Sequence, residues 1–336
     1  MKRTRQLGFC LLVSFLALQS SCVTLSGEPE RREIESSMSL DEAFHLAISQ
    51  GKQSMTELKR LVKARQAWND LSKMSLAYMK ANLGSANRIE FSNAISLYQA
   101  SSPEVDPSII ELLFAKRDPF YTQLALQLAS LRPSKKVGES IERELSNAIT
   151  QGREEQILSP QLAMAIRLNS ISTSYSLMRR GLLLTGEDEF AKTMISSDPN
   201  LAAWDFMDYL ARADLDDLRQ LSQKTVNMYT CLVILRFYLN HPLPVAHPQF
   251  KSLIYYAVSR NSALSEMARS VLEAQIPNFK DQIAYWLATE KLEVQIAFIE
   301  SARQNPTPNI KLMLSNLKDI TRFKEVAEEI DAIQRF

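Results

Sequence analysis

Glycine is scarce in this sequence: it makes up only 8 of 336 residues, although it averages about 7% of protein residues. Neither G-x-G-x-x-G nor G-x-x-x-x-G-K-[ST] occurs. Phosphate-binding loops need such glycines so that backbone amides can approach the ligand. Asn-Gly and Asp-Gly, which tight β-hairpins favour, are also absent. The composition therefore argues against the common nucleotide-binding folds and against a protein built from β-hairpins.

Cysteine and histidine are rare as well, with three of each. His241 and His247 lie six residues apart in a proline-rich stretch with no cysteine or acidic residue close by. A zinc site needs three or four ligands, so we expect a solvated loop there instead. Cys231 lies in the apolar segment "TCLVILRFYL", which predicts a buried, unreactive thiol. We predict no metal site and no cofactor.

Motifs that carry catalysis are missing too. Neither G-x-S-x-G nor H-E-x-x-H occurs. The acidic stretch 213–219, "ADLDDLR", lacks the glycine and the terminal glutamate of a calcium loop. It is typical of a helix start, where the macrodipole favours acidic side chains. We therefore identify no catalytic residue and predict that the chain is not an enzyme.

The amino terminus is basic and then apolar. Lys2, Arg3 and Arg5 precede an almost unbroken apolar run over residues 7–18. A bilayer-spanning helix needs about 20 apolar residues, so a run of this length suits the central region of a secretory signal peptide. Small residues and Cys22 follow, and after them the chain becomes polar.

This order resembles the signal peptide of a bacterial lipoprotein, in which the chain is cut before a cysteine that becomes lipidated. Ser21 matches the small residue before the cysteine, whereas Gln19 stands where the family has an aliphatic residue. The resemblance implies lipidation of Cys22 and anchoring in the cell envelope. Val23 follows the cysteine where an aspartate would retain the protein in the inner membrane, so the outer membrane is the expected location. A plain secretory signal and a short N-terminal anchor are the alternatives.

Cleavage before Cys22 would leave 36 Lys and Arg against 38 Asp and Glu. A near-neutral chain gives no electrostatic reason to bind nucleic acid, and we expect no such partner. Residues 23–38 are polar, contain Gly27 and Pro29 and show no apolar periodicity. They are typical of a flexible tether.

Helical structure is expected from Ser39 onward. The sequence "SLDE" at 39–42 is a capping box, and apolar residues at helical spacing predict one long helix over 56–81. From residue 106, X-Pro dipeptides precede apolar runs. Asp, Ser and Asn cap helix N-termini, and proline suits the first helical position. The starts at 118, 159 and 198 lie 41 and 39 residues apart. Starts are predicted at Asp106, Asp118, Ser159, Asp198, His247 and Asn305.

Periods of about 30 to 47 residues built from helix pairs are typical of α-solenoids. The segment 312–333 resembles a HEAT or armadillo-type repeat, and Leu317, Asp319, Lys324 and Val326 match its pattern loosely. The resemblance covers residues 106–334 and implies an all-α fold, a right-handed superhelix of stacked helix pairs. A tetratricopeptide array is the alternative, although its small-residue positions do not align at a period of about 34 residues. The expected organisation is a signal peptide (1–21), lipidated Cys22 with a tether (22–38), an N-terminal helical region (39–105) and a HEAT-like α-solenoid (106–336).

Aromatic side chains off the apolar faces provide the candidate interaction surface. In the helix expected from Phe250, Tyr255 and Tyr256 fall opposite the core face, and Tyr285 does so in the helix expected from Phe279. Trp204 flanks a polar stripe in the helix from residue 201. Exposed Tyr and Trp often anchor protein interfaces. The alternative is packing between repeats, because solenoid helices bury two faces.

These features predict an envelope lipoprotein that binds or scaffolds other envelope proteins through an extended helical-repeat surface. Its expected partners are one or more envelope proteins and, through the lipid, the membrane. Two alternatives remain open: an envelope enzyme, such as an α-superhelical cell-wall-processing protein, and a structural subunit of an envelope assembly.

Overall fold

A computed structural model describes residues 38–84, 87–172, 175–213, 215–219, 226–244, 246–304 and 306–335. The predicted signal peptide, Cys22 and the tether up to residue 37 lie outside these residues. Throughout the described ranges the regular structure is helical, with nineteen α-helices and no strand, which confirms the all-α prediction. None of these helices is both long enough and apolar enough to span a bilayer.

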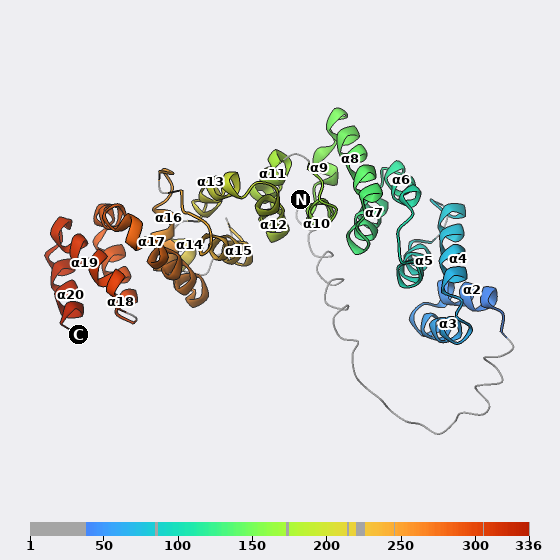
Figure 1. The fold of residues 1–336 in the computed structure, drawn as a ribbon, viewed down its shortest axis with the longest axis horizontal. Coiled ribbons are helices and arrows are strands. Elements are labelled where there is room, and N and C mark those ends of the chain that lie inside the picture. The colour runs from blue at the N-terminus through green and yellow to red at the C-terminus, as the bar shows by residue number, and fades with distance from the viewer. Residues whose placement is uncertain are drawn as a thin grey trace, which may run out of the picture.

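The helices keep the labels of Figure 1, which start at α2. They are α2 (Leu40–Gln50), α3 (Lys52–Arg65), α4 (Trp68–Ala81), α5 (Arg88–Ser101), α6 (Pro107–Ala115), α7 (Pro119–Leu131), α8 (Lys135–Thr150), α9 (Glu154–Ile157), α10 (Pro160–Leu168), α11 (Tyr175–Thr185), α12 (Asp188–Ser197), α13 (Pro199–Leu210), α14 (Leu215–Arg219), α15 (Met228–Tyr238), α16 (Ser252–Ala257), α17 (Ser262–Thr289), α18 (Leu292–Arg303), α19 (Pro308–Ile320) and α20 (Lys324–Gln334).

Most of these helices fall into two rows, defined by which helices pack together. In the first row α2 packs on α5, and α7, α10, α12, α15, α17 and α19 each pack on the next. In the second row α4, α6 and α8 each pack on the next, as do α11, α13, α16, α18 and α20. Pairs such as α6 with α7, α11 with α12 and α19 with α20 join the rows.

Extensive contacts in the described chain join only helices that are at most three positions apart in the helix order. Figure 1 shows the consequence: the helices follow one another along an extended, arched path, with α2 and α3 at one end and α20 at the other. The contact of α4 with α6 also joins the predicted N-terminal region, residues 39–105, directly to the chain from residue 106.

One continuous cluster of buried apolar side chains runs through the helices. Phe91, Phe190, Phe206 and Tyr238 are completely buried within it. Gly181 of α11 is needed where α11 meets α12, because a Cβ there would overlap the ring of Phe190. The helices therefore bury their apolar faces mainly against neighbours close in the chain.

Five of the seven predicted helix starts are confirmed. At Ser39 the capping box forms in full, since the Ser39 hydroxyl accepts from the Glu42 amide and the Glu42 carboxylate accepts from the Ser39 amide. The other confirmed caps accept amide hydrogen bonds at 2.8 to 3.2 Å, each with proline at the start of the helix. They are Asp106, Asp118, Ser159 and Asp198.

Two predicted starts are wrong. His247 does not cap a helix: it is buried in a turn segment, and α16 begins later, at Ser252. Asn305 lies outside the described residues, and the helix there begins at Pro308 with Thr307 as its cap, 3.3 Å from the Ile310 amide. Thr307-Pro308 obeys the same rule as the dipeptide two residues earlier, so local chemistry alone does not choose between them.

One predicted helix is interrupted, and one predicted helix start falls at a kink inside a longer helix. The expected helix over 56–81 is interrupted at Gln66, which takes a left-handed conformation with φ +52°. The Ala67 amide donates back to the Val62 carbonyl at 3.0 Å, closing α3 before α4 turns away. The helix expected from Phe279 corresponds to the second part of α17. Phe279, two residues after Pro277, takes a non-helical conformation with φ −136° and ψ 24°, and two helical segments meet there across a kink.

Candidate functional site

The four aromatic residues singled out from the sequence have different environments. Trp204 in α13 is 44% exposed and Tyr285 in α17 is 62% exposed, as expected for surface residues. Tyr255 in α16 is half-buried. Tyr256, also in α16, is completely buried, so its predicted place on the surface is wrong.

Tyr256 is buried because α16 is packed on several sides. Besides α17, this six-residue helix contacts α13, α14 and α18. The Tyr256 hydroxyl donates to the Leu210 carbonyl at 3.2 Å and lies 3.4 Å from the Cys231 sulfur. Burial raises the pKa of Tyr256 well above its usual value. Tyr256 therefore stabilises the contact between helices and is unavailable to a partner.

Tyr255 also has a partner within the fold. Its hydroxyl donates to the Glu290 carboxylate at 2.9 Å, and Lys251 lies 3.6 Å from the same carboxylate. Glu290 is buried at the end of α17. Burial and this hydrogen bond raise the pKa of Tyr255 to about 12. The hydrogen bond from Tyr255 thus offsets part of the free-energy cost of burying Glu290. It also holds α16 against the end of α17.

Trp204 lies in a network of paired charges. Its ring packs edge-on against His247, with 4.7 Å between the ring centroids. Asp208, one turn further along α13, lies 3.5 Å from His247 and 3.1 Å from Arg179. Arg179 also donates to Asp205 at 2.8 Å. The prediction that His247 lies in a solvated loop is wrong, because Trp204 and Asp208 cover this histidine.

These aromatic residues do not form one compact site. Trp204 and Tyr255 lie on the second row, on α13 and α16, whereas Tyr285 lies on α17 of the first row. The Tyr285 side chain makes no hydrogen bond with the described residues. The exposed candidates that remain, Trp204 and Tyr285, are separate surface positions.

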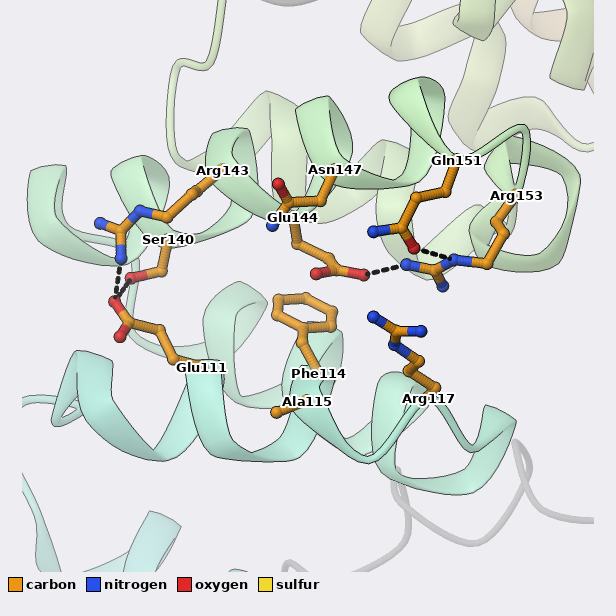
Figure 2. A pocket seen from close by; sticks show the side chains of 10 residues that line it. All are labelled: Glu111, Phe114, Ala115, Arg117, Ser140, Arg143, Glu144, Asn147, Gln151 and Arg153. Carbon is orange, nitrogen blue, oxygen red and sulfur yellow. Dashed lines mark hydrogen bonds and ion pairs between the residues drawn. The ribbon is translucent and has the colours of Figure 1, made fainter.

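A pocket of about 310 Å³ lies elsewhere, between α6 and α8 (Figure 2). We call it the α6–α8 pocket. Phe114 and Ala115 provide its apolar part, and three arginines, two glutamates and two amides surround them. The lining residues are Glu111, Phe114, Ala115, Arg117, Ser140, Arg143, Glu144, Asn147, Gln151 and Arg153.

Helical periodicity places the pocket residues. Ser140, Arg143, Glu144, Asn147 and Gln151 recur every three or four positions, so α8 presents one polar stripe to α6. Val137, Ile141, Leu145 and Ala148 of α8 are buried beside this stripe. Our sequence interpretation missed this stripe because it considered only aromatic residues as surface markers; a polar stripe at helical spacing was the available signal.

Two of the three pocket arginines are paired. Arg143 lies 2.9 Å from Glu111, which also accepts from the Ser140 hydroxyl at 2.9 Å. Arg153 lies 3.5 Å from Glu144 and donates to the Gln151 side-chain oxygen at 2.8 Å. Figure 2 shows the two clusters at opposite ends of the pocket.

Arg117 has no ion pair or hydrogen bond from its guanidinium among the described residues. Figure 2 shows its side chain reaching from the end of α6 into the pocket, towards Glu144 and Arg153. The Asn147 side chain likewise makes no hydrogen bond with the described residues. A guanidinium carries five donors and no acceptor, so the free groups of the pocket suit an anion.

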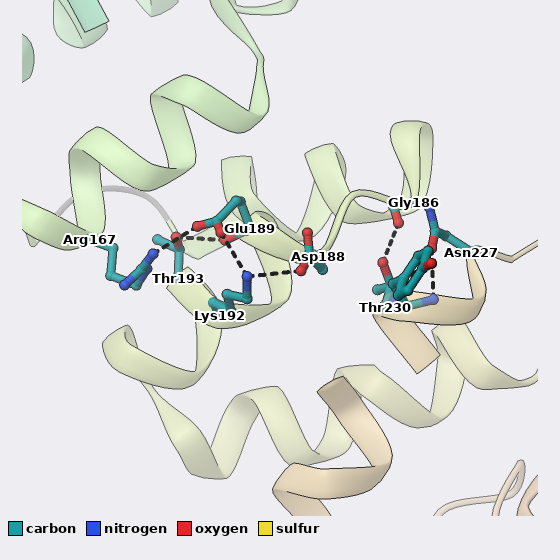
Figure 3. Close-up of polar contacts among 9 residues, drawn as sticks. Arg167, Gly186, Asp188, Glu189, Lys192, Thr193, Asn227 and Thr230 are labelled. Atoms are coloured by element: carbon teal, nitrogen blue, oxygen red, sulfur yellow. Dashed lines mark hydrogen bonds and ion pairs between the residues drawn. The ribbon is translucent and has the colours of Figure 1, made fainter. Parts of the chain in front are cut away.

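A second polar cluster, on α12, is held together by ion pairs among its own members (Figure 3). Glu189 lies 2.8 Å from both Arg167 and Lys192, and Lys192 is also 2.8 Å from Asp188. Burial alone would raise the pKa of Glu189, but the hydrogen bonds from Lys192 and Arg167 lower it below its usual value. The Thr193 hydroxyl donates to the Ala163 carbonyl at 2.8 Å. This cluster joins α10 to α12 and is structural.

The same view shows a second structural contact, at the start of α15 (Figure 3). The Thr230 hydroxyl donates to the Gly186 carbonyl at 2.5 Å, and the Asn227 side chain caps α15 by accepting from the Tyr229 amide at 2.9 Å. The Thr230 bond fastens α15 to the turn before α12, and the Asn227 bond closes the start of α15 itself.

Chemistry that needs a thiolate is disfavoured at Cys231. The residue is buried as predicted, and burial raises the pKa of its thiol to about 12, so the thiol stays protonated at neutral pH. Residues 215–219 form the short helix α14, with Asp216 and Asp217 in its first turn, as the acidic stretch predicted. The described residues contain no group of three or more His, Cys, Asp or Glu side chains that could hold a metal ion.

Comparison with known proteins finds no match: no family, no curated protein and no solved structure is significantly similar to this chain.

Proposed function

We propose that this chain is a lipid-anchored protein of the cell envelope, most simply of the outer membrane, whose HEAT-like α-solenoid binds another envelope protein. Cys22 would carry the lipid, and residues 23–38 would tether the helices to the membrane. The helices would form a right-handed superhelix of stacked pairs. In this proposal the chain recognises and positions a partner and carries out no reaction.

The observation that carries the proposal is the two-row arrangement with contacts confined to near neighbours. In a solenoid each helix pair buries its faces on adjacent pairs, and the stack grows in one dimension. The extended path in Figure 1 fits such growth. A stack of this kind offers a long surface relative to its mass, which suits protein recognition.

Polar bridges between stacked helices support the repeat interpretation. In the second row, Glu111 meets Arg143 across α6 and α8, Arg179 meets Asp205 across α11 and α13, and Arg303 meets Glu329 across α18 and α20. The partners are 32, 26 and 26 residues apart. A bridge spanning roughly one repeat, found at three of the second-row junctions, is what stacked helix pairs produce.

Trp204 and Tyr285 are the residues we propose to contact the partner. Both are aromatic, exposed and located on regular helices. Aromatic residues of this kind contribute a large share of binding energy when a partner buries them.

Site-specific photo-cross-linking in intact cells tests this function. A p-benzoylphenylalanine residue would replace Trp204 or Tyr285 in the full chain. Tyr229 on α15, which is 67% exposed, is the matched control position. We expect a discrete cross-linked product from positions 204 and 285 and none from position 229. Equal products from all three positions, or none from any, would contradict a specific binding surface there.

A further inference from the structure

We infer that the α6–α8 pocket binds a carboxylate group on the partner polypeptide, the side chain of a glutamate or aspartate. This inference rests on the proposed binding function and specifies the chemistry of one contact within it.

The charge balance of the pocket supports an acidic ligand. Three guanidinium groups face two carboxylates. Glu111 is satisfied by Arg143 at 2.9 Å and Glu144 is paired with Arg153 at 3.5 Å. Arg117 is left over, with a full positive charge and no partner in the described chain. One further carboxylate would complete the set.

The backbone holds Arg117 at the pocket. It occupies the single left-handed position, φ +52°, between the end of α6 and Asp118, which caps α7. Its amide donates to the Phe114 carbonyl at 3.0 Å. Because helices fix the chain on both sides, the guanidinium starts from a defined point at the edge of the pocket. The side chain is exposed, so a ligand can reach it from solvent.

The remaining groups favour a carboxylate carried on a hydrocarbon stem. Arginine and carboxylate form two parallel hydrogen bonds in a fork-to-fork arrangement. Gln151 uses its oxygen to accept from Arg153, which leaves its NH₂ group as a donor beside Asn147. Phe114 and Ala115 offer an apolar surface for methylene groups. A volume of about 310 Å³ is at the lower end for ligand pockets and suits one or two side chains of a peptide.

Binding of a fluorescein-labelled hexaglutamate peptide tests the inference. Fluorescence anisotropy would be measured on the full chain purified in detergent, with hexaglutamine as the uncharged peptide. The test variant is Arg117→Gly, because glycine accepts the left-handed backbone and the fold is preserved. We expect hexaglutamate to bind, hexaglutamine not to bind, and Arg117→Gly to weaken binding about tenfold or more, the typical effect of a charged hydrogen bond.

Two control variants separate this site from general attraction. Arg60→Ala removes an exposed arginine of α3 that has no partner in the described residues and lies outside the pocket. Gln66→Gly repeats the glycine substitution at another left-handed position, also φ +52°. Both should bind hexaglutamate as the native chain does. Equal weakening by Arg60→Ala would show diffuse charge attraction and overturn the assignment, as would native affinity in Arg117→Gly.

Inorganic phosphate provides the last comparison. If phosphate displaces hexaglutamate at a concentration similar to the Kd of the peptide, the pocket is a small-anion site and the carboxylate assignment is wrong. The cross-linking experiment keeps the two proposals distinct. Cross-links at positions 204 and 285 without Arg117-dependent peptide binding would overturn this inference alone. Arg117-dependent binding without those cross-links would overturn the proposed aromatic surface and leave the pocket as a carboxylate site.

Discussion

Tyr255 and Tyr256 are neighbours in α16, yet one is half-buried and the other has no exposure at all. A helical projection distinguishes the apolar face of a helix from its remaining surface. It contains no information on which other helices cover that remaining surface. α13 lies against α16 on the side where Tyr256 projects, and the Leu210 carbonyl of α13 accepts from its hydroxyl at 3.2 Å. At the residue scale, therefore, exposure follows from neighbours distant in the sequence.

Alanine substitutions at Tyr285 and Tyr256 should give opposite results. Tyr285→Ala should change the free energy of unfolding by less than about 0.5 kcal/mol, because the side chain is 62% exposed. Tyr256→Ala should cost about 3–5 kcal/mol, by analogy with Phe→Ala in protein cores, because it leaves a cavity. Chemical denaturation of the two variants measures both values. A large loss at position 285 would mean that Tyr285 packs between helices and cannot be a free docking residue.

At the scale of the element, helix starts were easier to predict from the sequence than helix ends. Asp106, Asp118, Ser159 and Asp198 cap their helices as predicted, because a cap and its proline act within three residues. Helix ends at Gln66, Arg117 and Ser170 use non-glycine residues with positive φ. Such residues are not strong local signals for the end of a helix. The sequence-based prediction of one helix over 56–81 therefore missed the break at Gln66.

Two buried helical glycines offer a paired test of how closely the elements approach. Gly181→Ala on α11 should destabilise the fold by about 1–3 kcal/mol, because the new methyl group would overlap the Phe190 ring. Gly138→Ala on α8 is the control: its Cβ would have no neighbour closer than 3.4 Å, and alanine favours helix over glycine by about 1 kcal/mol. Thermal melts of the two variants should shift in opposite directions. A shift of the same sign in both would contradict the close contact of α11 with α12.

At the scale of the whole molecule, stability and alignment come from different interactions. The buried apolar cluster runs the length of the described chain and supplies most of the favourable free energy. Several ion pairs between stacked helices are exposed, such as those of Arg143 with Glu111 and Arg303 with Glu329. Exposed pairs contribute only about 0–1 kcal/mol each. Their placement between stacked helices is better explained as fixing how one helix sits on the next than as a source of stability.

Anchoring is also a property of the whole molecule, and it has a direct test. Mass spectrometry of the mature protein should find residue 22 at the amino terminus, carrying acyl chains on the cysteine. Cys22→Ser should abolish lipidation. If the signal peptide is still cleaved, the variant should appear in the soluble fraction; if it is not cleaved, the variant should retain residues 1–21. Membrane fractionation of the native chain should recover it in the outer membrane. A mature terminus elsewhere, or an unmodified Cys22, would contradict the lipoprotein assignment.

The sequence by itself determined the helical class, five of the seven predicted helix starts, the burial of Cys231 and the exposure of Trp204 and Tyr285. Each of these depends on residues within a few positions of one another, through capping, helical periodicity or the composition of a short segment. Only the tertiary structure decided that Tyr256 and His247 are buried and that Arg117 is left unpaired between α6 and α8. Those outcomes depend on which surfaces meet across some 30 residues of chain, and burial and charge pairing belong to the contact between two helices rather than to either helix alone.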